Sequence, residues 1–203
     1  MRIIDGLALQ GREIPDSSRD DLPQFFVDMG YKVGAEIGVL RGEFTEKLCQ
    51  AGLKVYGIDP WRAYSDYRRD SREEPYDVQY EMAKQRLAPY DCTIIRKTSM
   101  EAAEDFKMGS LDFVYIDGNH HLRYVVDDIW EWSLRTRSGG TVSGHDYELN
   151  GRSPTSHQAC HVVHAVDVYM KVWGIKNWYI LGRYRPIEGE KRDKHRSWLW
   201  LRI

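Results

Sequence analysis

Short apolar runs alternate with longer segments of helical periodicity along most of this chain. Apolar runs of strand length occupy residues 33–39, 54–59, 92–97, 111–117 and 140–146. The runs VGAEIGV and LDFVYID are apolar almost throughout, as strands covered on both faces should be. Helical patterns fill the gaps, at residues 42–52, 76–87, 99–106 and 121–136. This alternation predicts an α/β fold built on a mostly parallel sheet.

The two ends of the chain depart from that alternation. Residues 159–173 carry a further helical pattern, and residues 177–182 and 197–202 read as two strands separated by a polar loop. Because no helix lies between these strands, they cannot form a right-handed parallel crossover, and we expect them to pair antiparallel. The prediction is a doubly wound, Rossmann-like sheet of seven strands, mostly parallel, with a C-terminal antiparallel strand. Near the start, residues 20–29 predict one short helix over the sheet edge.

Length and composition indicate one packed domain. The chain has 203 residues, 42% of them apolar, and seven tryptophans. We divide it into an N-terminal extension with a cap helix, residues 1–30, and a main domain, residues 31–203. The 29 basic and 31 acidic residues give a net charge of −2, which offers no electrostatic footprint for nucleic acid or an anionic membrane.

Cysteine usage and the N-terminus bear on the compartment. The three cysteines are widely spaced and form no CxxC pair, which favours a reduced, cytoplasmic protein. The first residues lack the basic start and apolar run of a signal peptide, and no stretch reaches transmembrane length.

The first candidate motif is GAEIGVLRGEFTEKL, at the turn from the first long strand into a helix. Gly38 and Gly42 allow the backbone to approach a ligand closely, and the helix N-terminus offers free N–H groups. Glu36 can accept from an ammonium or a hydroxyl group. A dinucleotide site would carry GxGxxG, whereas this chain has only GxxxG.

The second motif is VYGIDPW, at the end of the next strand. Asp59 can accept both hydroxyls of a ribose, and it follows the first motif at about 20 residues, the spacing of adjacent strands in one nucleotide-binding unit. Trp61 could stack on an adenine face. The alternative for Trp61 is plain packing on a loop.

Two further strands end in Asp and His. The fourth strand ends in YIDGNHH and the fifth in SGHDY. Since the carboxyl ends of parallel strands meet at one edge of the sheet, their carboxylates and imidazoles should converge there. Asp and His suit both general-base catalysis and metal ligation, and a helix-capping role remains open for single histidines.

Together the motifs GAEIGVLRG, GIDPW, FVYIDGNHH and GGTVSGHDY resemble class I S-adenosylmethionine-dependent methyltransferases. Within that class they look most similar to the small-molecule branch that includes macrocin-type sugar O-methyltransferases. The resemblance runs from about residue 33 to the C-terminus. It implies S-adenosylmethionine as methyl donor, S-adenosylhomocysteine as product, and a small hydroxylated acceptor such as a sugar, polyol or phenol.

The resemblance also implies roles for single residues in binding the donor. Glu36 would meet the methionine ammonium group, directly or through water, and Gly38 would lie against the methionyl moiety. Asp59 would hold the ribose, and Trp61 would cover one adenine face.

The later motifs supply the remaining roles. Thr98 and Ser99 would lie near the adenine edge, and Asp117 would contact the cofactor as well. Asp117 and Asp146 match two carboxylates that ligate a divalent cation in metal-dependent members of the branch, so Mg²⁺ is a candidate ion here.

This chain departs from those metal-dependent members at two positions. Asn119 stands where they carry an acidic residue proposed as the base, and His145 stands where they carry a second aspartate. Two routes to deprotonate the acceptor therefore stay open. One has His120 or His145 as general base, oriented by Asp117 or Asp146, and the other has Mg²⁺ on Asp117 and Asp146, which lowers the pKa of the acceptor hydroxyl.

Other interpretations remain at this point. A nucleotide-dependent oxidoreductase and a non-catalytic binding module that kept the fold are the rivals. The charged, tyrosine-rich residues 61–76 are either a lid over the site or a solvated loop. The first 30 residues either complete a homodimer interface or cover the cofactor.

Overall fold

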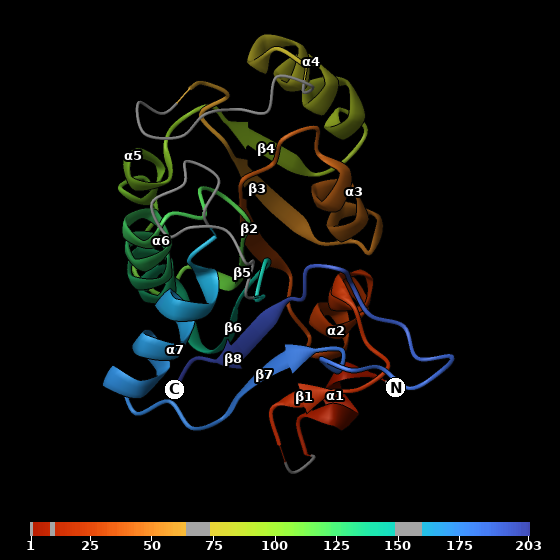
Figure 1. Ribbon diagram of the computed structural model, residues 1–203. Helices are drawn as coiled ribbons and strands as arrows, with labels where there is room; N and C mark the ends of the chain where they lie inside the picture. The colour runs from red at the N-terminus through yellow and green to blue at the C-terminus, as the bar shows by residue number, and fades with distance from the viewer. Residues whose placement is uncertain (1, 9–10, 64–73, 149–159) are drawn as a thin grey trace.

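The computed structural model describes residues 2–8, 11–63, 74–148 and 160–203 (Figure 1). One sheet runs through the molecule in the strand order β1-β7-β8-β6-β5-β2-β3-β4. Its strands are β1 (Glu13–Ile14), β2 (Val33–Ile37), β3 (Lys54–Ile58), β4 (Cys92–Ile95), β5 (Leu111–Ile116), β6 (Thr136–Gly144), β7 (Trp178–Leu181) and β8 (Trp198–Leu201).

The helices lie on both faces of this sheet (Figure 1). They are α1 (Ile3–Gly6), α2 (Leu22–Asp28), α3 (Glu43–Gln50), α4 (Tyr76–Leu87), α5 (Ser99–Ala103), α6 (Leu122–Arg135) and α7 (Val162–Val172). A short 3₁₀ turn, Arg19–Asp21, leads into α2. Of the helices in these residues, none is long and apolar enough to cross a membrane.

The predicted doubly wound α/β sheet is confirmed. β2, β3 and β4 follow one another outward in one direction, and β5 returns to the other side of β2 before β6 continues, all pairs being parallel. The winding therefore reverses between β2 and β5, and a crevice is expected outside the carboxyl ends of these two strands. The predicted antiparallel element is also present, because β8 pairs antiparallel with both β6 and β7.

The sheet has one strand more than the seven predicted. β1 has only two residues and pairs parallel with β7 through Glu13 and Ile14. A two-residue strand leaves no periodic pattern to detect. It makes part of the N-terminal extension an edge of the main sheet.

Two predicted placements need correction. The helix expected over the sheet edge, α2, packs on the sheet centre instead, where Phe26 stacks on Phe113 of β5 at 4.1 Å between ring centroids. The strand expected from residue 140 begins already at Thr136, so that Gly139 and Gly140 lie inside β6. A Cβ on Gly140 would lie 2.4 Å from the Asp112 carbonyl oxygen, so this glycine marks a close approach of two strands.

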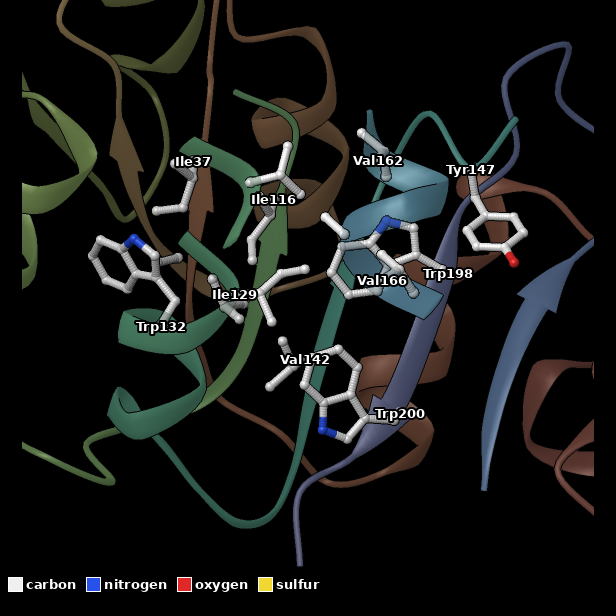
Figure 2. Close-up of a cluster of buried hydrophobic side chains, with 14 of the residues drawn as sticks. Ile37, Ile116, Ile129, Trp132, Val142, Tyr147, Val162, Val166, Trp198 and Trp200 are labelled. Carbon is white, nitrogen blue, oxygen red and sulfur yellow. The ribbon is translucent and has the colours of Figure 1, made fainter. Parts of the chain in front are cut away.

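Alternate residues of the central strands belong to two hydrophobic cores, one on each face of the sheet. Val114 and Ile116 of β5 belong to the core under the helices α5, α6 and α7. Ile116 lies there in one cluster with Trp132 and with Trp198 of the C-terminal strand (Figure 2). Phe113 and Tyr115 face α2 and α3 on the other side. Burial on both faces explains why the strand sequences are apolar nearly throughout. The rigid sheet fixes the positions of the residues that follow each strand.

Candidate functional site

A cavity of about 880 Å³ opens at the carboxyl ends of β2, β3 and β5, at the point where the winding reverses. Its size lies in the range of pockets for small molecules and cofactors. The predicted residues among those that line it are Glu36, Gly38, Asp59, Thr98, Ser99, Asp117 and His120. The lining also includes Arg19 and Asp128, which belong to none of the motifs in the sequence.

The loop between β2 and α3 requires glycine at its first position. Gly38 has φ +91°, and a Cβ there would lie 2.1 Å from the carbonyl oxygen of Asp117. No side chain fits that gap. Gly38 thus lets the β2 loop touch the end of β5, and both Gly38 and Asp117 line the cavity.

Glu36 is a buried carboxyl group at the end of β2. Its side chain accepts a hydrogen bond from the Thr45 hydroxyl of α3, and the residue is 2% exposed. Burial raises the pKa of Glu36 well above its usual value, and the Thr45 hydroxyl only partly opposes this. A cationic ligand group would favour the ionised form.

Asp59 connects the end of β3 to the neighbouring loop. Its Oδ2 accepts from the backbone N–H groups of Val39 (3.1 Å) and Leu40 (3.0 Å), and its Oδ1 accepts from that of Trp61 (2.8 Å). Burial nevertheless raises the pKa of Asp59. A carboxylate offers about four acceptor sites, so these three donors leave capacity for one ribose hydroxyl rather than for both.

Trp61 does not face the cavity. It is 1% exposed, packs edge-on against Tyr80 and lies in a small core with Val39. Its indole N–H donates to the Leu40 carbonyl at 2.8 Å. The interpretation as an adenine-stacking residue is therefore replaced by the alternative, packing beneath the loop.

The start of α5 brings a buried carboxyl group into the lining. Thr98 caps α5 through the backbone N–H of Glu101. The Ser99 hydroxyl donates to Asp128 of α6 and accepts from the Trp132 indole at 2.7 Å. Burial raises the pKa of Asp128 to about 7. Asp128 lies on the apolar face of α6, and an acidic residue on such a face is the signal that could have revealed it.

Asp and His side chains from β5 and β6 converge beside the cavity, as predicted. The His120 Nε2 lies 3.6 Å from Asp117 Oδ1 and 3.1 Å from Asp146 Oδ2. The His145 Nδ1 lies 3.2 Å from Asp146 Oδ2 and 3.8 Å from Asp117 Oδ1. Asp146 has φ +56°, a conformation that Asp tolerates better than most residues and that is common at functional sites.

A third imidazole reaches this cluster from the loop before β8. The His195 Nδ1 lies 3.4 Å from Asp146 Oδ1 and 2.6 Å from Glu148 Oε1. His195 was not predicted as a site residue, because it lies in a polar loop far along the chain. Only the antiparallel return of β8 beside β6 places it here.

The charges in the cluster stabilise one another. Burial lowers the pKa of His120 and of His145, but the carboxylates of Asp117 and Asp146 outweigh it, so both pKa values end above the usual value. Burial raises the pKa of Asp146, yet the three histidines hold it well below its usual range. Asp146 thus remains ionised at neutral pH beside two imidazoles that bind a proton readily.

The same cluster has the donor set of a divalent-cation site. In the described part of the chain, Asp117, His120 and Asp146 form the one group of at least three such side chains whose ligand atoms lie within 4.8 Å of one another. Ligand atoms about 2.1 Å from a metal lie about 3 to 4 Å apart, which fits the distances from His120 Nε2. That buried Nε2 also lacks a hydrogen-bond partner of proper geometry among the described residues.

The segment expected as a lid or a solvated loop, residues 61–76, lies mostly outside the described residues, which end at position 63 and resume at position 74.

The strand order and the cavity at the winding reversal define a class: a doubly wound α/β protein with a ligand-sized cavity at the carboxyl ends of its strands. Residues 35–147 match the model of a methyltransferase domain family, and the chain belongs to that family. Among curated proteins none matches this chain in sequence.

Solved methyltransferases share the fold at low sequence identity. The O-methyltransferase from Bacillus cereus, solved with S-adenosylhomocysteine, is 15% identical with a TM-score of 0.59, and the match covers 91% of this chain and 80% of that one. TomG from Streptomyces achromogenes, an O-methyltransferase of tomaymycin synthesis solved with S-adenosylmethionine, is 12% identical with a TM-score of 0.59, and the match covers 91% of this chain and 79% of that one. An rRNA methylase from Streptococcus thermophilus is 13% identical with a TM-score of 0.59, and the match covers 90% of this chain and 94% of that one. This fold therefore serves both small and large acceptors.

Proposed function

We propose that this chain is an S-adenosylmethionine-dependent methyltransferase that methylates a hydroxyl group of a small acceptor, such as a sugar, polyol or phenol. The observation that carries the proposal is that one cavity, at the winding reversal of a methyltransferase-family sheet, is lined by Glu36, Gly38 and Asp59. The ligands of the Bacillus cereus and Streptomyces achromogenes enzymes support the same donor.

The donor's amino-acid and ribose groups would bind along β2 and β3. Glu36 is a buried carboxyl group with a raised pKa, so an ammonium group that approaches it gains a partner and draws it into the ionised form. Gly38 allows the methionyl chain to pass close to the backbone. Asp59 would accept from one ribose hydroxyl while it continues to hold the loop through Val39 and Leu40.

The nucleobase would lie at the start of α5. Thr98 and Ser99 line that end of the cavity together with Asp128, whose carboxyl group accepts from Ser99. This arrangement supports the proposal that polar groups of α5 and α6 meet the adenine edge. Asp117, at the opposite wall, would contact the donor beside Glu36.

The transfer itself is an in-line displacement at a sulfonium methyl group, so alignment of acceptor and donor supplies much of the acceleration. The acceptor hydroxyl also has to lose a proton. His120 or His145 can take it, and Asp117 and Asp146 lie close enough to orient either imidazole and to stabilise it once charged.

A divalent cation is compatible with the same residues. Asp117, His120 and Asp146 would hold it, and bound there it would lower the pKa of the acceptor hydroxyl. Two carboxylates suit Mg²⁺, whereas the imidazole shifts the preference toward Mn²⁺ or another transition-metal ion.

The sequence also supports proposals for the branch, the acceptor, the compartment and the domain bounds. We propose the macrocin-type branch, a free small-molecule acceptor rather than nucleic acid, and a reduced cytoplasmic setting, which the three free cysteines fit. We also propose residues 31–203 as the catalytic domain and residues 1–30 as its N-terminal extension.

A labelled-methyl assay tests the function. The protein is incubated with methyl-labelled S-adenosylmethionine and separate pools of sugars, polyols, phenols and amines, with an NADH-oxidation assay run in parallel. We expect label in a hydroxyl pool, reduced by about 100-fold or more in Asp146→Asn, because that substitution weakens both routes to the deprotonated acceptor. Transfer only to amines, or NADH turnover without methyl transfer, would contradict the proposal.

A further inference from the structure

Arg19 is a cation placed at the acidic end of the cavity. It lines the cavity together with Glu36 and Asp117, and its Nη1 lies 3.3 Å from Asp117 Oδ2. Among the described residues, the other arginine of the lining is Arg62, which follows β3 and lies 3.7 Å from Glu101 of α5, at the end of the cavity assigned to the nucleobase. In this part of the chain, each end of the cavity therefore has one guanidinium group.

The backbone around Arg19 is held both by the N-terminal extension itself and by the segments that follow β7. The Arg19 N–H donates to Asp193 at 2.5 Å, and the preceding Ser18 forms a capping box with Asp21. Two residues before Arg19, Ser17 accepts from the backbone N–H of Gly182 just after β7. These contacts fix the turn before a ligand arrives, so little ordering remains to be done on binding.

The guanidinium group keeps donors for a second anion. Its Cζ lies 5.2 Å from the centroid of the Phe44 ring, and its polar neighbours among the described residues are Asp117, the Tyr115 hydroxyl and, farther away, Glu36. A guanidinium has five N–H donors in a planar fork, more than these neighbours can use. The side chain is 31% exposed, so a ligand in the cavity can reach it.

The donor's amino-acid end is a zwitterion, and the cavity must satisfy both charges. Glu36 and Asp117 suit the ammonium group, but a carboxylate beside them would be repelled without a cation close by. We propose that Arg19 binds the α-carboxylate of S-adenosylmethionine, so that the N-terminal extension completes the methionyl subsite. This inference rests on the proposed function and names the residue that recognises the donor's carboxylate.

A pair of ligands that differ only in this carboxylate tests the inference. S-adenosylmethionine and decarboxylated S-adenosylmethionine are titrated calorimetrically into the wild-type protein and Arg19→Gln, with thermal unfolding of each variant as a folding control. Charge-assisted hydrogen bonds predict that Arg19→Gln weakens S-adenosylmethionine binding about 10- to 100-fold and decarboxylated S-adenosylmethionine less than about threefold. Arg19→Lys, which keeps the charge without the fork, should recover part of the loss.

Arg62→Gln is the matched control, because it removes a guanidinium group from the other end of the same cavity. It should change the affinity for both ligands by the same factor. Equal weakening of both ligands in Arg19→Gln would overturn the inference and assign Arg19 a structural role through Asp117. Unchanged affinity for both would overturn it as well. If the wild-type protein bound neither ligand, the proposed function itself would fail, and this inference with it.

Discussion

Asp128→Asn should make this protein more stable at alkaline pH. Asp128 is 4% exposed, and burial raises its pKa to about 7 from an ordinary 3.8. The folded protein therefore keeps a proton that the unfolded chain has already released between these two pH values. Wild-type stability must fall as the pH rises through this window, because folding then has to bury a carboxylate or retain its proton.

The magnitude follows from the two pKa values. A tenfold change in an acid dissociation constant is worth about 1.4 kcal/mol, so the full effect is on the order of 4 kcal/mol, of which about 3 kcal/mol develops between about pH 5 and pH 8. Asparagine has no proton to lose and can still accept from Ser99. Across that interval, the free energy of unfolding of Asp128→Asn should therefore rise by about 3 kcal/mol relative to that of the wild type.

Urea unfolding of both proteins at several pH values measures the difference directly. The pH at which the stability of the protein stops falling reports the pKa of Asp128 in the folded state, and two further variants should shift this pH in opposite directions. Ser99→Ala removes a hydrogen bond that lowers the pKa of Asp128, so this pH should rise. Asp127→Asn removes a nearby negative charge that raises the pKa, so this pH should fall. A difference between wild type and Asp128→Asn that stays constant from about pH 5 to pH 8 would refute the reasoning.

Two other predictions concern the loop and the metal site. Gly38→Ala should lower the free energy of unfolding, measured with urea, by several kcal/mol, because its Cβ would lie 2.1 Å from the Asp117 carbonyl oxygen. Gly52→Ala is the control: Gly52 has φ +87° but open space around it, so the free energy of unfolding should fall by only about 1 kcal/mol. Equal costs would contradict the close contact. In calorimetric titration Mn²⁺ should bind more tightly than Mg²⁺, and His120→Ala should remove most of that preference. Tighter Mg²⁺ binding by the wild type would argue against His120 as a ligand.

The sheet was predictable because its signals are local. Strands such as β5 are buried on both faces and carry continuous apolar runs, and the residues that follow parallel strands must meet at one edge. This is why Asp117 and Asp146 were expected together and lie within reach of the same imidazole, that of His120. β1 was not predicted, because a strand of two residues shows no alternation of apolar and polar positions.

The residues that were missed or misread depend on tertiary geometry. Spacing put Trp61 near the cavity, but its backbone has φ +42° and its indole packs downward onto α4, which no spacing rule reveals. Arg19 and His195 lie in segments with no periodic pattern, and they reach the site only because β1 and β8 attach those segments to the sheet. Asp128 was detectable, since a lone carboxyl group on the apolar face of a helix needs a buried partner or a function.

Calorimetric titration with S-adenosylhomocysteine is the most direct test of the central claim, that the cavity between β2 and β5 binds the methyl donor. The wild-type protein should bind it, and Asp59→Asn, which removes the charge while its amide oxygen still accepts from the N–H groups of Val39 and Leu40, should weaken binding by about 10-fold or more. NAD⁺, titrated in parallel, should give no heat. Binding of NAD⁺ without S-adenosylhomocysteine would contradict the account.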